Sequence, residues 1–174
     1  MIVLLEQILA STVILTTPIL LAAIGGLVNR QGGIVNTALE GKMLAGAFVA
    51  VVVSAATGSW LLAVVAAALT SAMIGYLFSL TITRANANMI IAGLGLNVLI
   101  AGLLGFLLSR AYGTSGTLRL PDIDLLPKFL PESAASVPLF GKTLAALDPL
   151  TLLAWVCVFT LPFFLANTRI GLRL

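Results

Sequence analysis

The sequence predicts an all-α fold: a polytopic transmembrane helical bundle of about five spanning helices, with a glycine-rich broken or re-entrant segment near 30–41. Of the 174 residues, 60% are hydrophobic and only 9% are charged, whereas soluble domains carry about 25% charged residues. Four stretches contain no formal charge, namely 7–29, 43–83, 85–109 and 149–168. A spanning helix needs roughly 20 apolar residues, and a soluble protein could not hide this much apolar surface, so lipid must be the solvent for much of it.

The spanning helices are predicted at 8–28, 42–57, 60–82, 89–109 and 149–167. The uncharged stretch that begins at residue 43 is about twice the length of one crossing. Thr57-Gly58-Ser59 is a turn signal inside it, so it is divided into two helices. Apolar runs of this length indicate helices because backbone polar groups in lipid must be satisfied within the segment.

Three connections differ in character. Residues 29–41 are polar and glycine-rich, residues 84–88 form a tight polar turn, and residues 110–148 form a long loop with four prolines and charges of both signs. Basic residues exceed acidic ones around the first two connections and at the C-terminus. The positive-inside rule therefore predicts that these face the cytoplasm, with the long loop and the N-terminus outside.

Several functional classes are disfavoured by the composition. The net charge is +3 and the bases are spread over membrane flanks, so nucleic-acid binding is not expected. With Cys157 alone and no histidine, a Cys/His metal site is excluded and no metal is expected. The chain has no P-loop pattern, and Gly93-Leu94-Gly95 lacks the strand and third glycine of a dinucleotide-binding turn.

Small residues recur every four positions on three predicted helices, which is the spacing that keeps them near one helix face. Such rows allow helix backbones to approach closely in membranes, so they predict helix packing. The rows are Gly46, Ala50 and Ser54; Ala67, Ser71, Gly75 and Ser79; and Gly93, Asn97, Ala101, Gly105 and Ser109.

Asn97 stands apart in its row because its amide lies near the middle of a span, where an unpaired polar group is costly. One interpretation is an interhelical hydrogen bond, and the other is contact with a translocation path. Replacing Asn97 by leucine is expected to impair transport while leaving membrane insertion intact.

The segment 30–46 is the most informative part of the chain. Asn36 and Glu40 are four residues apart, so a helix here would stack them on one face. Gly32, Gly33 and Gly41 allow a broken backbone, and interrupted helices often line substrate paths in transporters. A cytoplasmic loop followed by an ordinary helix cap explains the same residues, so both interpretations stay open.

Four ordered segments resemble one known family. Residues 33–41, GIVNTALEG, resemble a signature of glycine, two hydrophobic residues, asparagine, three variable residues, glutamate and glycine. It is found in the inner-membrane permease subunits of ABC importers for branched-chain amino acids, simple sugars and nucleosides. The nucleoside branch of that family is also similar at 17–27, TPILLAAIGGL, at 84–97, RANANMIIAGLGLN, and at 168–174, TRIGLRL.

The resemblance implies a multi-pass permease of the cell (inner or plasma) membrane that translocates a small polar solute, a nucleoside or simple sugar, by alternating access. It implies no catalysis and no cofactor bound by this chain, with ATP on a separate ATP-binding subunit. The other implied partners are a second, homologous permease subunit and a substrate-binding lipoprotein or periplasmic protein. Asn36, Glu40 and Asn97 are the substrate-path candidates, and Gly32, Gly33, Gly41 and Gly93 the backbone positions of the motifs.

Near the end of the chain, Arg169, Gly171 and Arg173 correspond to the cytoplasmic start of the family's coupling element. In the family this element continues into a helix that docks on the ATP-binding subunit, and further spanning helices follow. We therefore expect residues 1–174 to form a single transmembrane permease domain, an N-terminal fragment without the coupling helix and the C-terminal helices.

Three other functions are weighed against this expectation. In an ATP-independent secondary transporter or channel, Glu40 would be a protonatable or ion-binding group. In a non-transporting membrane scaffold, the polar residues would only pack helices. A membrane-embedded enzyme is disfavoured because no histidine, metal cluster or nucleophile constellation is present.

Overall fold

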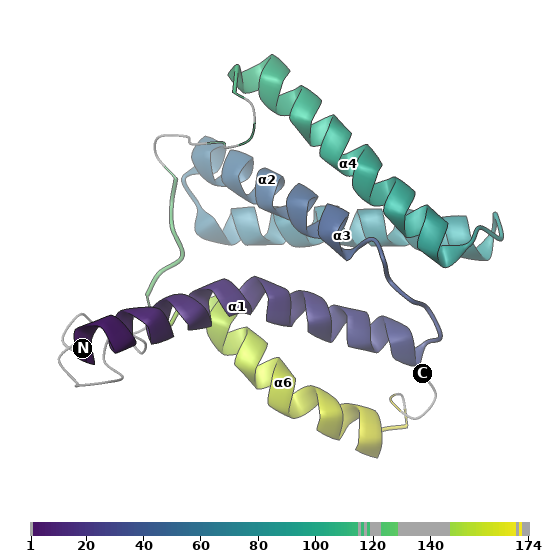
Figure 1. The fold of residues 1–174 in the computed structure, drawn as a ribbon, viewed down its shortest axis with the longest axis horizontal. Helices are drawn as coiled ribbons and strands as arrows, with labels where there is room; N and C mark the ends of the chain where they lie inside the picture. The colour runs from purple at the N-terminus through teal and green to yellow at the C-terminus, as the bar shows by residue number, and fades with distance from the viewer. Residues whose placement is uncertain are drawn as a thin grey trace. The chain divides into compact units, whose positions relative to one another are not determined.

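The computed structural model describes residues 2–114, 116, 118, 123–128, 147–169 and 171. Across this part of the chain, five helices are long and apolar enough to cross a membrane, which confirms the predicted all-α class (Figure 1). The helices are α1 (Ile2–Gln31), α2 (Leu39–Thr57), α3 (Trp60–Thr83), α4 (Met89–Tyr112) and α6 (Pro149–Asn167).

The helices extend beyond the predicted spans at several ends. α1 covers 2–31 rather than 8–28, and α4 continues to Tyr112 before Gly113 takes a left-handed φ of 63°. Hydrophobic length marks only the part of a helix that lies in hydrocarbon. Backbone hydrogen bonds continue past it, so Arg30 and Arg110 lie in last helical turns, where cations also suit the helix dipole.

The chain divides into two compact units, Met1–Gly33 with Leu126–Leu174, and Ile34–Leu125. In the first unit α1 packs against α6. The hydroxyls of Thr17 and Thr151 are 3.1 Å apart and hydrogen-bonded, and both side chains are buried. Asp148 caps α6 by accepting from the Thr151 N–H at 2.7 Å. The assignment of the whole chain to a single permease domain stays a prediction.

In the second unit α2 packs along both α3 and α4 (Figure 1). The α2–α3 contact is close because Gly46 has no side chain: a Cβ there would lie 2.9 Å from Ser71 Oγ. The Ser71 hydroxyl donates to the Lys42 carbonyl oxygen at 3.2 Å. The prediction of close packing between these two small-residue rows is therefore confirmed at this crossing.

At each end of the second unit, hydrogen bonds join connecting segments that are far apart in the sequence. At one end, Asp124 accepts from the Trp60 N–H at 3.0 Å, and its carbonyl accepts from the Ser54 hydroxyl at 2.9 Å. At the other end, the Thr37 hydroxyl donates to the Met89 carbonyl at 3.0 Å. The loop after α4 thus lies beside the α2–α3 turn, and the glycine-rich segment lies beside the turn before α4, as an alternating topology requires.

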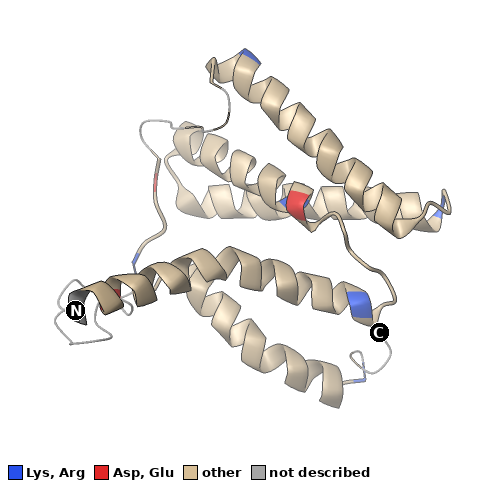
Figure 2. Ribbon diagram, in the orientation of Figure 1, with Lys and Arg blue, Asp and Glu red and all other residues tan. Residues whose placement is uncertain are grey.

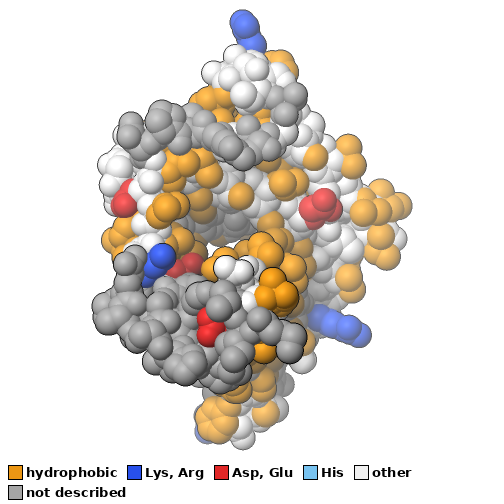
Figure 3. Space-filling view, turned by 60° about the vertical axis from the view of Figure 1, so that its left-hand side comes forward, with side chains coloured by type: hydrophobic (Ala, Val, Ile, Leu, Met, Phe, Trp, Pro, Cys, Tyr) orange, Lys and Arg blue, Asp and Glu red, His pale blue; other side chains and the backbone are white. Residues whose placement is uncertain are grey.

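The surfaces of the helices are apolar. Figure 2 shows long helical stretches without charged residues, and Figure 3 shows hydrophobic side chains over much of the described surface. Leu15, Val98 and Phe159 are 72%, 75% and 73% exposed. Soluble proteins rarely expose apolar patches this extensive, so these faces suit the interior of a membrane rather than water. The chain is a multi-pass membrane protein.

Candidate functional site

The glycine-rich segment begins where α1 ends. Gly33 adopts a left-handed φ of 77°, and its N–H donates to the Arg30 carbonyl at 3.0 Å. Gly32 closes the preceding turn on the Val28 carbonyl. A residue with a Cβ is strained at such an angle, so Gly33 suits a helix end. The boundary between the two compact units falls directly after Gly33.

The glycine-rich connection between α1 and α2 is not helical, which is consistent with both interpretations of segment 30–46. Residues 32–38 are not helical, and Asn36 lies in the middle of this segment. The Thr37 N–H then bonds the Val35 carbonyl at 3.1 Å, and α2 starts at Leu39. The stacking of Asn36 on Glu40 that a continuous helix would produce does not occur, because the helix begins only after Asn36.

Asn97 joins this segment to α4 through both ends of its carboxamide. Its Oδ1 accepts from the Gly41 N–H at 2.8 Å, and its Nδ2 donates to the Thr37 carbonyl at 3.0 Å. Ala38, at the N-cap of α2, makes no side-chain cap bond. Since the first N–H groups of a helix lack intrahelical partners, Asn97 caps α2 from another helix. We call this pair of bonds the Asn97 clasp.

The clasp shows the interhelical hydrogen bond, the first of the two interpretations of Asn97. A role for Asn97 in a translocation path stays a prediction.

Two motif glycines allow the clasp to form. A Cβ on Gly41 would lie 2.9 Å from both Asn97 Oδ1 and Ile100 Cδ1. A Cβ on Gly93 would collide with Thr37 Oγ1 and lie 2.8 Å from Thr37 Cβ. Glycines that are far apart in the sequence thus serve one contact, in which segment 37–41 lies directly against the first turns of α4.

Asn36 contacts Lys42 rather than Glu40. Its Oδ1 accepts a hydrogen bond from Lys42 Nζ at 3.0 Å. The same ammonium lies 5.2 Å from the ring centroid of Phe78, which is buried. Sequence reasoning treated Lys42 only as a flanking charge. A usable signal existed, because Lys42 lies within an apolar span close to two motif residues.

Glu40 stays outside this network. Its side chain is exposed and borders a shallow apolar depression with Met43, Leu44 and Ala47. In the described residues it makes no hydrogen bond or ion pair. The structure therefore brings together Gly41, Gly93 and Asn97, pairs Asn36 with Lys42 instead, and leaves Glu40 exposed on α2.

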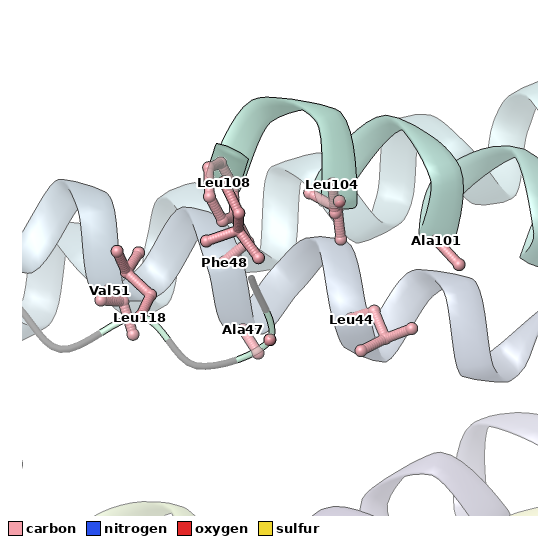
Figure 4. Close-up of a pocket in the computed structure, with 10 residues that line it drawn as sticks. Leu44, Ala47, Phe48, Val51, Ala101, Leu104, Leu108 and Leu118 are labelled. Carbon is pink, nitrogen blue, oxygen red and sulfur yellow. The ribbon is translucent and has the colours of Figure 1, made fainter. Parts of the chain in front are cut away.

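An apolar groove of about 450 Å³ lies between α2 and α4 beyond the clasp (Figure 4). A Cβ on Gly105 would meet nothing within 4 Å, so this part of the α4 row has no close neighbour in the described residues. The small-residue row packs closely only at the start of α4. Among the lining residues are Leu44, Phe48 and Val51 of α2 and Ala101, Leu104 and Leu108 of α4.

The remaining candidates belong to the first unit. Arg169 is exposed, and the Gly171 N–H donates to Thr168 Oγ1 at 3.0 Å. Arg173 lies outside the described residues. A coupling role for these residues stays a prediction.

Five apolar helices long enough to span a membrane, with a polar contact between segment 37–41 and α4, define a multi-pass membrane protein in the described part of the chain. Residues 8–174 match the family model for the permease component of the branched-chain amino acid transport system. The chain therefore belongs to this permease family.

Three curated relatives are similar over nearly the whole chain. The guanosine ABC transporter permease NupQ of Bacillus subtilis is 26% identical, over 96% of this chain and 56% of its own length. The nucleoside ABC transporter permease NupC of Lactococcus lactis is 31% identical, over 98% of this chain and 55% of its own length. A putative glucose ABC transporter permease of Haloferax volcanii is 30% identical, over 95% of this chain and 50% of its own length.

The chain thus spans about half the length of the curated relatives that it matches. No solved structure matches the chain.

Proposed function

We propose that this chain forms part of the membrane-spanning permease of an ATP-driven importer, which carries a nucleoside or simple sugar across the cell membrane by alternating access. The observation that supports this most is the interrupted segment 32–38, clasped to α4 by Asn97 in a chain of the permease family. Nucleosides are favoured because two of the similar relatives carry guanosine or nucleoside in their names.

The Asn97 clasp is a contact that segment 37–41 could exchange for another during transport. Asn97 bonds only backbone groups, Gly41 N–H and the Thr37 carbonyl, and these would be costly to leave unpaired in a membrane. The segment is therefore stable when docked on α4, and stable again only where new partners replace Asn97. Such a discrete exchange is the kind of rearrangement that alternating access needs, with Asn36 and Glu40 as path candidates on either side of Thr37.

The same proposal assigns separate roles to this chain and to its partner subunits. This chain performs no covalent chemistry and binds no cofactor, and ATP is hydrolysed on a partner ATP-binding subunit. A second, homologous permease subunit completes the pathway. A substrate-binding lipoprotein or periplasmic protein delivers the solute to the outer face, which includes the loop after α4.

Reconstitution of the full-length protein tests this proposal. The permease is placed in liposomes with its ATP-binding subunit and binding protein, and uptake of labelled guanosine and ribose is measured with and without ATP. We expect uptake only with ATP and the complete set of partners. Uptake that requires neither would instead support an ATP-independent transporter or channel.

A further inference from the structure

Lys42 is a charged residue inside a spanning helix that the proposed function does not yet use. It lies in α2, three residues after the helix starts, and its side chain is half-buried. Its ammonium donates to Asn36 Oδ1 at 3.0 Å and lies over the Phe78 ring. Ionisable residues within membrane helices are costly and are usually kept for function.

The ammonium is held in place from several sides. Gly75 of α3 lies next to it, since a Cβ there would be in ordinary van der Waals contact with Lys42, 3.5 Å from Nζ and 3.7 Å from Cε. The Ser71 hydroxyl, one turn earlier on α3, bonds the Lys42 carbonyl at 3.2 Å. A lysine near a helix end usually extends its charge toward water. Here Phe78 of α3 and the Asn36 side chain contact the charged group instead.

No carboxylate forms an ion pair with this charge in the described part of the chain. Glu40 is two residues away, and residues two apart on a helix do not face each other. Asp124 lies at the opposite end of the unit, where it accepts from the Trp60 N–H. The other described charges of this unit, Arg84 and Arg110, are basic and exposed. Among the described residues of this unit, the positive charge is thus held in place without a carboxylate partner.

Within the described part of the chain, Lys42 and Asn36 also have hydrogen-bond donors that are not used. An ammonium has three N–H donors and no acceptor, and a carboxamide has two N–H donors besides its oxygen. The Asn36 oxygen accepts from Lys42, so the two N–H donors on its Nδ2 are not part of that bond. Together, Lys42 and Asn36 offer donors and positive charge to any group that approaches. Such a site binds oxygen acceptors and repels cations.

We propose that Lys42 and Asn36 form a recognition site for uncharged or anionic, oxygen-rich solutes, and that Lys42 excludes cationic ones. This inference rests on the proposed transport function and names the chemical class that the path accepts. Charge repulsion is strong there because the dielectric constant within a membrane protein is low. Neutral solutes with hydroxyl and carbonyl oxygens gain charge-assisted hydrogen bonds instead.

The test compares two ribosides. Guanosine is neutral, whereas nicotinamide riboside carries a permanent positive charge on its pyridinium ring. Binding of each is measured by equilibrium dialysis to the full-length permease with its ATP-binding subunit in nanodiscs, without the binding protein, whose own selectivity is thereby removed. The variants are Lys42→Met, Lys42→Gln and Lys42→Arg, with Lys128→Met as a matched control at an exposed lysine outside the spans.

We expect the wild type, Lys42→Arg and Lys128→Met to prefer guanosine. Lys42→Gln should raise relative binding of the cation by about tenfold or more, because it keeps a donor but removes the charge. Lys42→Met should do the same and also weaken guanosine binding several-fold. If Lys42→Met does not assemble, the glutamine variant carries the test.

The result that overturns the inference is an unchanged ratio of cation to guanosine binding in Lys42→Gln, or equal binding of both ribosides by the wild type. Either result leaves the proposed function standing if guanosine uptake still depends on ATP. Loss of ATP-dependent guanosine uptake in the wild-type reconstitution would reject the proposed function itself.

Discussion

The start of α2 and the start of α6 satisfy their free N–H groups in opposite ways. α6 is capped by the residue directly before it, Asp148, whose carboxylate accepts from Thr151 N–H. α2 follows Ala38, which makes no side-chain cap bond, and is capped by Asn97 from 56 residues away. The first cap is available to an isolated helix, whereas the second exists only when α2 and α4 are packed.

The same contrast appears at the other two starts in the second unit. Asn88 caps α4 locally, accepting from Ile90 N–H at 2.9 Å and from Ile91 N–H at 3.3 Å. α3 has no local side-chain cap, and Asp124 from the loop after α4 accepts from Trp60 N–H. Helix starts that depend on distant residues tie local structure to tertiary contact. Contacts of this kind are the ones that a conformational change can exchange.

The largest effect should come from filling the space beneath the α2 start. Gly93→Ala places a Cβ against Thr37, so the segment must leave α4 and the clasp is lost. We expect destabilisation of about 3 kcal/mol, at the upper end of overpacking effects. Thermal unfolding of the purified protein measures it. Gly102→Ala on the same helix is the matched control, because its Cβ meets nothing within 4 Å; equal stability of the two variants would contradict the packing described.

Removal of the distant cap itself should have the next largest effect. Asn97→Leu leaves the Gly41 N–H and the Thr37 carbonyl without their partner, at a cost of about 2 kcal/mol. The apolar replacement should not impair membrane insertion, but transport should fall. Insertion is checked by membrane fractionation and transport by solute uptake in the reconstituted system. Uptake at the wild-type rate would reject a functional role for Asn97.

A smaller effect is expected at the α3 start, where the comparison can be sharpened. Asp124→Ala and Asp148→Ala should each cost about 1 kcal/mol, as for other helix caps. The two variants should differ in how many regions of the chain show faster hydrogen exchange. Hydrogen exchange should rise only at the start of α6 for Asp148→Ala. For Asp124→Ala it should rise both at the start of α3 and in residues 123–128, because Asp124 links the two. Equally local changes in both variants would remove the distinction.

The smallest effect should come from the polar contact inside the first unit. Thr17→Val and Thr151→Val each remove one hydroxyl of the buried pair without changing side-chain shape. Hydrogen bonds between membrane helices average about 0.6 kcal/mol in double-mutant cycles. A cycle over the two single variants and the double variant, followed by unfolding, should give a coupling of this size. A coupling of zero would show that the contact contributes nothing to α1–α6 packing.

The helices were predictable because lipid leaves the backbone few alternatives. Apolar length was sufficient to locate α3 and α6 to within a residue or two of their observed ends. α1 and α2 were predicted too short, since helical hydrogen bonds extend past the hydrocarbon to Gln31 and begin already at Leu39. The break near 30–41 was also predictable, because Gly32 and Gly33 together permit a helix end.

The site was predictable only in part. The spacing of Asn36 and Glu40 suggested a shared helix face, but that inference needs a continuous helix and the chain turns between them. Lys42 was treated as an ordinary base at the edge of a span, although its place within an apolar span and close to two motif residues was a usable signal. Nothing in the sequence indicates that its ammonium meets Asn36 and Phe78, since the latter contact depends on how α2 and α3 are paired.

By itself, the sequence determined the class of this protein and the approximate positions of its spans, since both follow from local properties: apolar length, glycine at breaks and an ordered set of family motifs. Only the tertiary structure decided the partner of each polar group. Asn97 caps α2, Asp124 caps α3, and Lys42 binds Asn36. Hydrogen bonds and charges act over a few ångströms in space, and residues 56 or 64 positions apart become neighbours only after the helices pack.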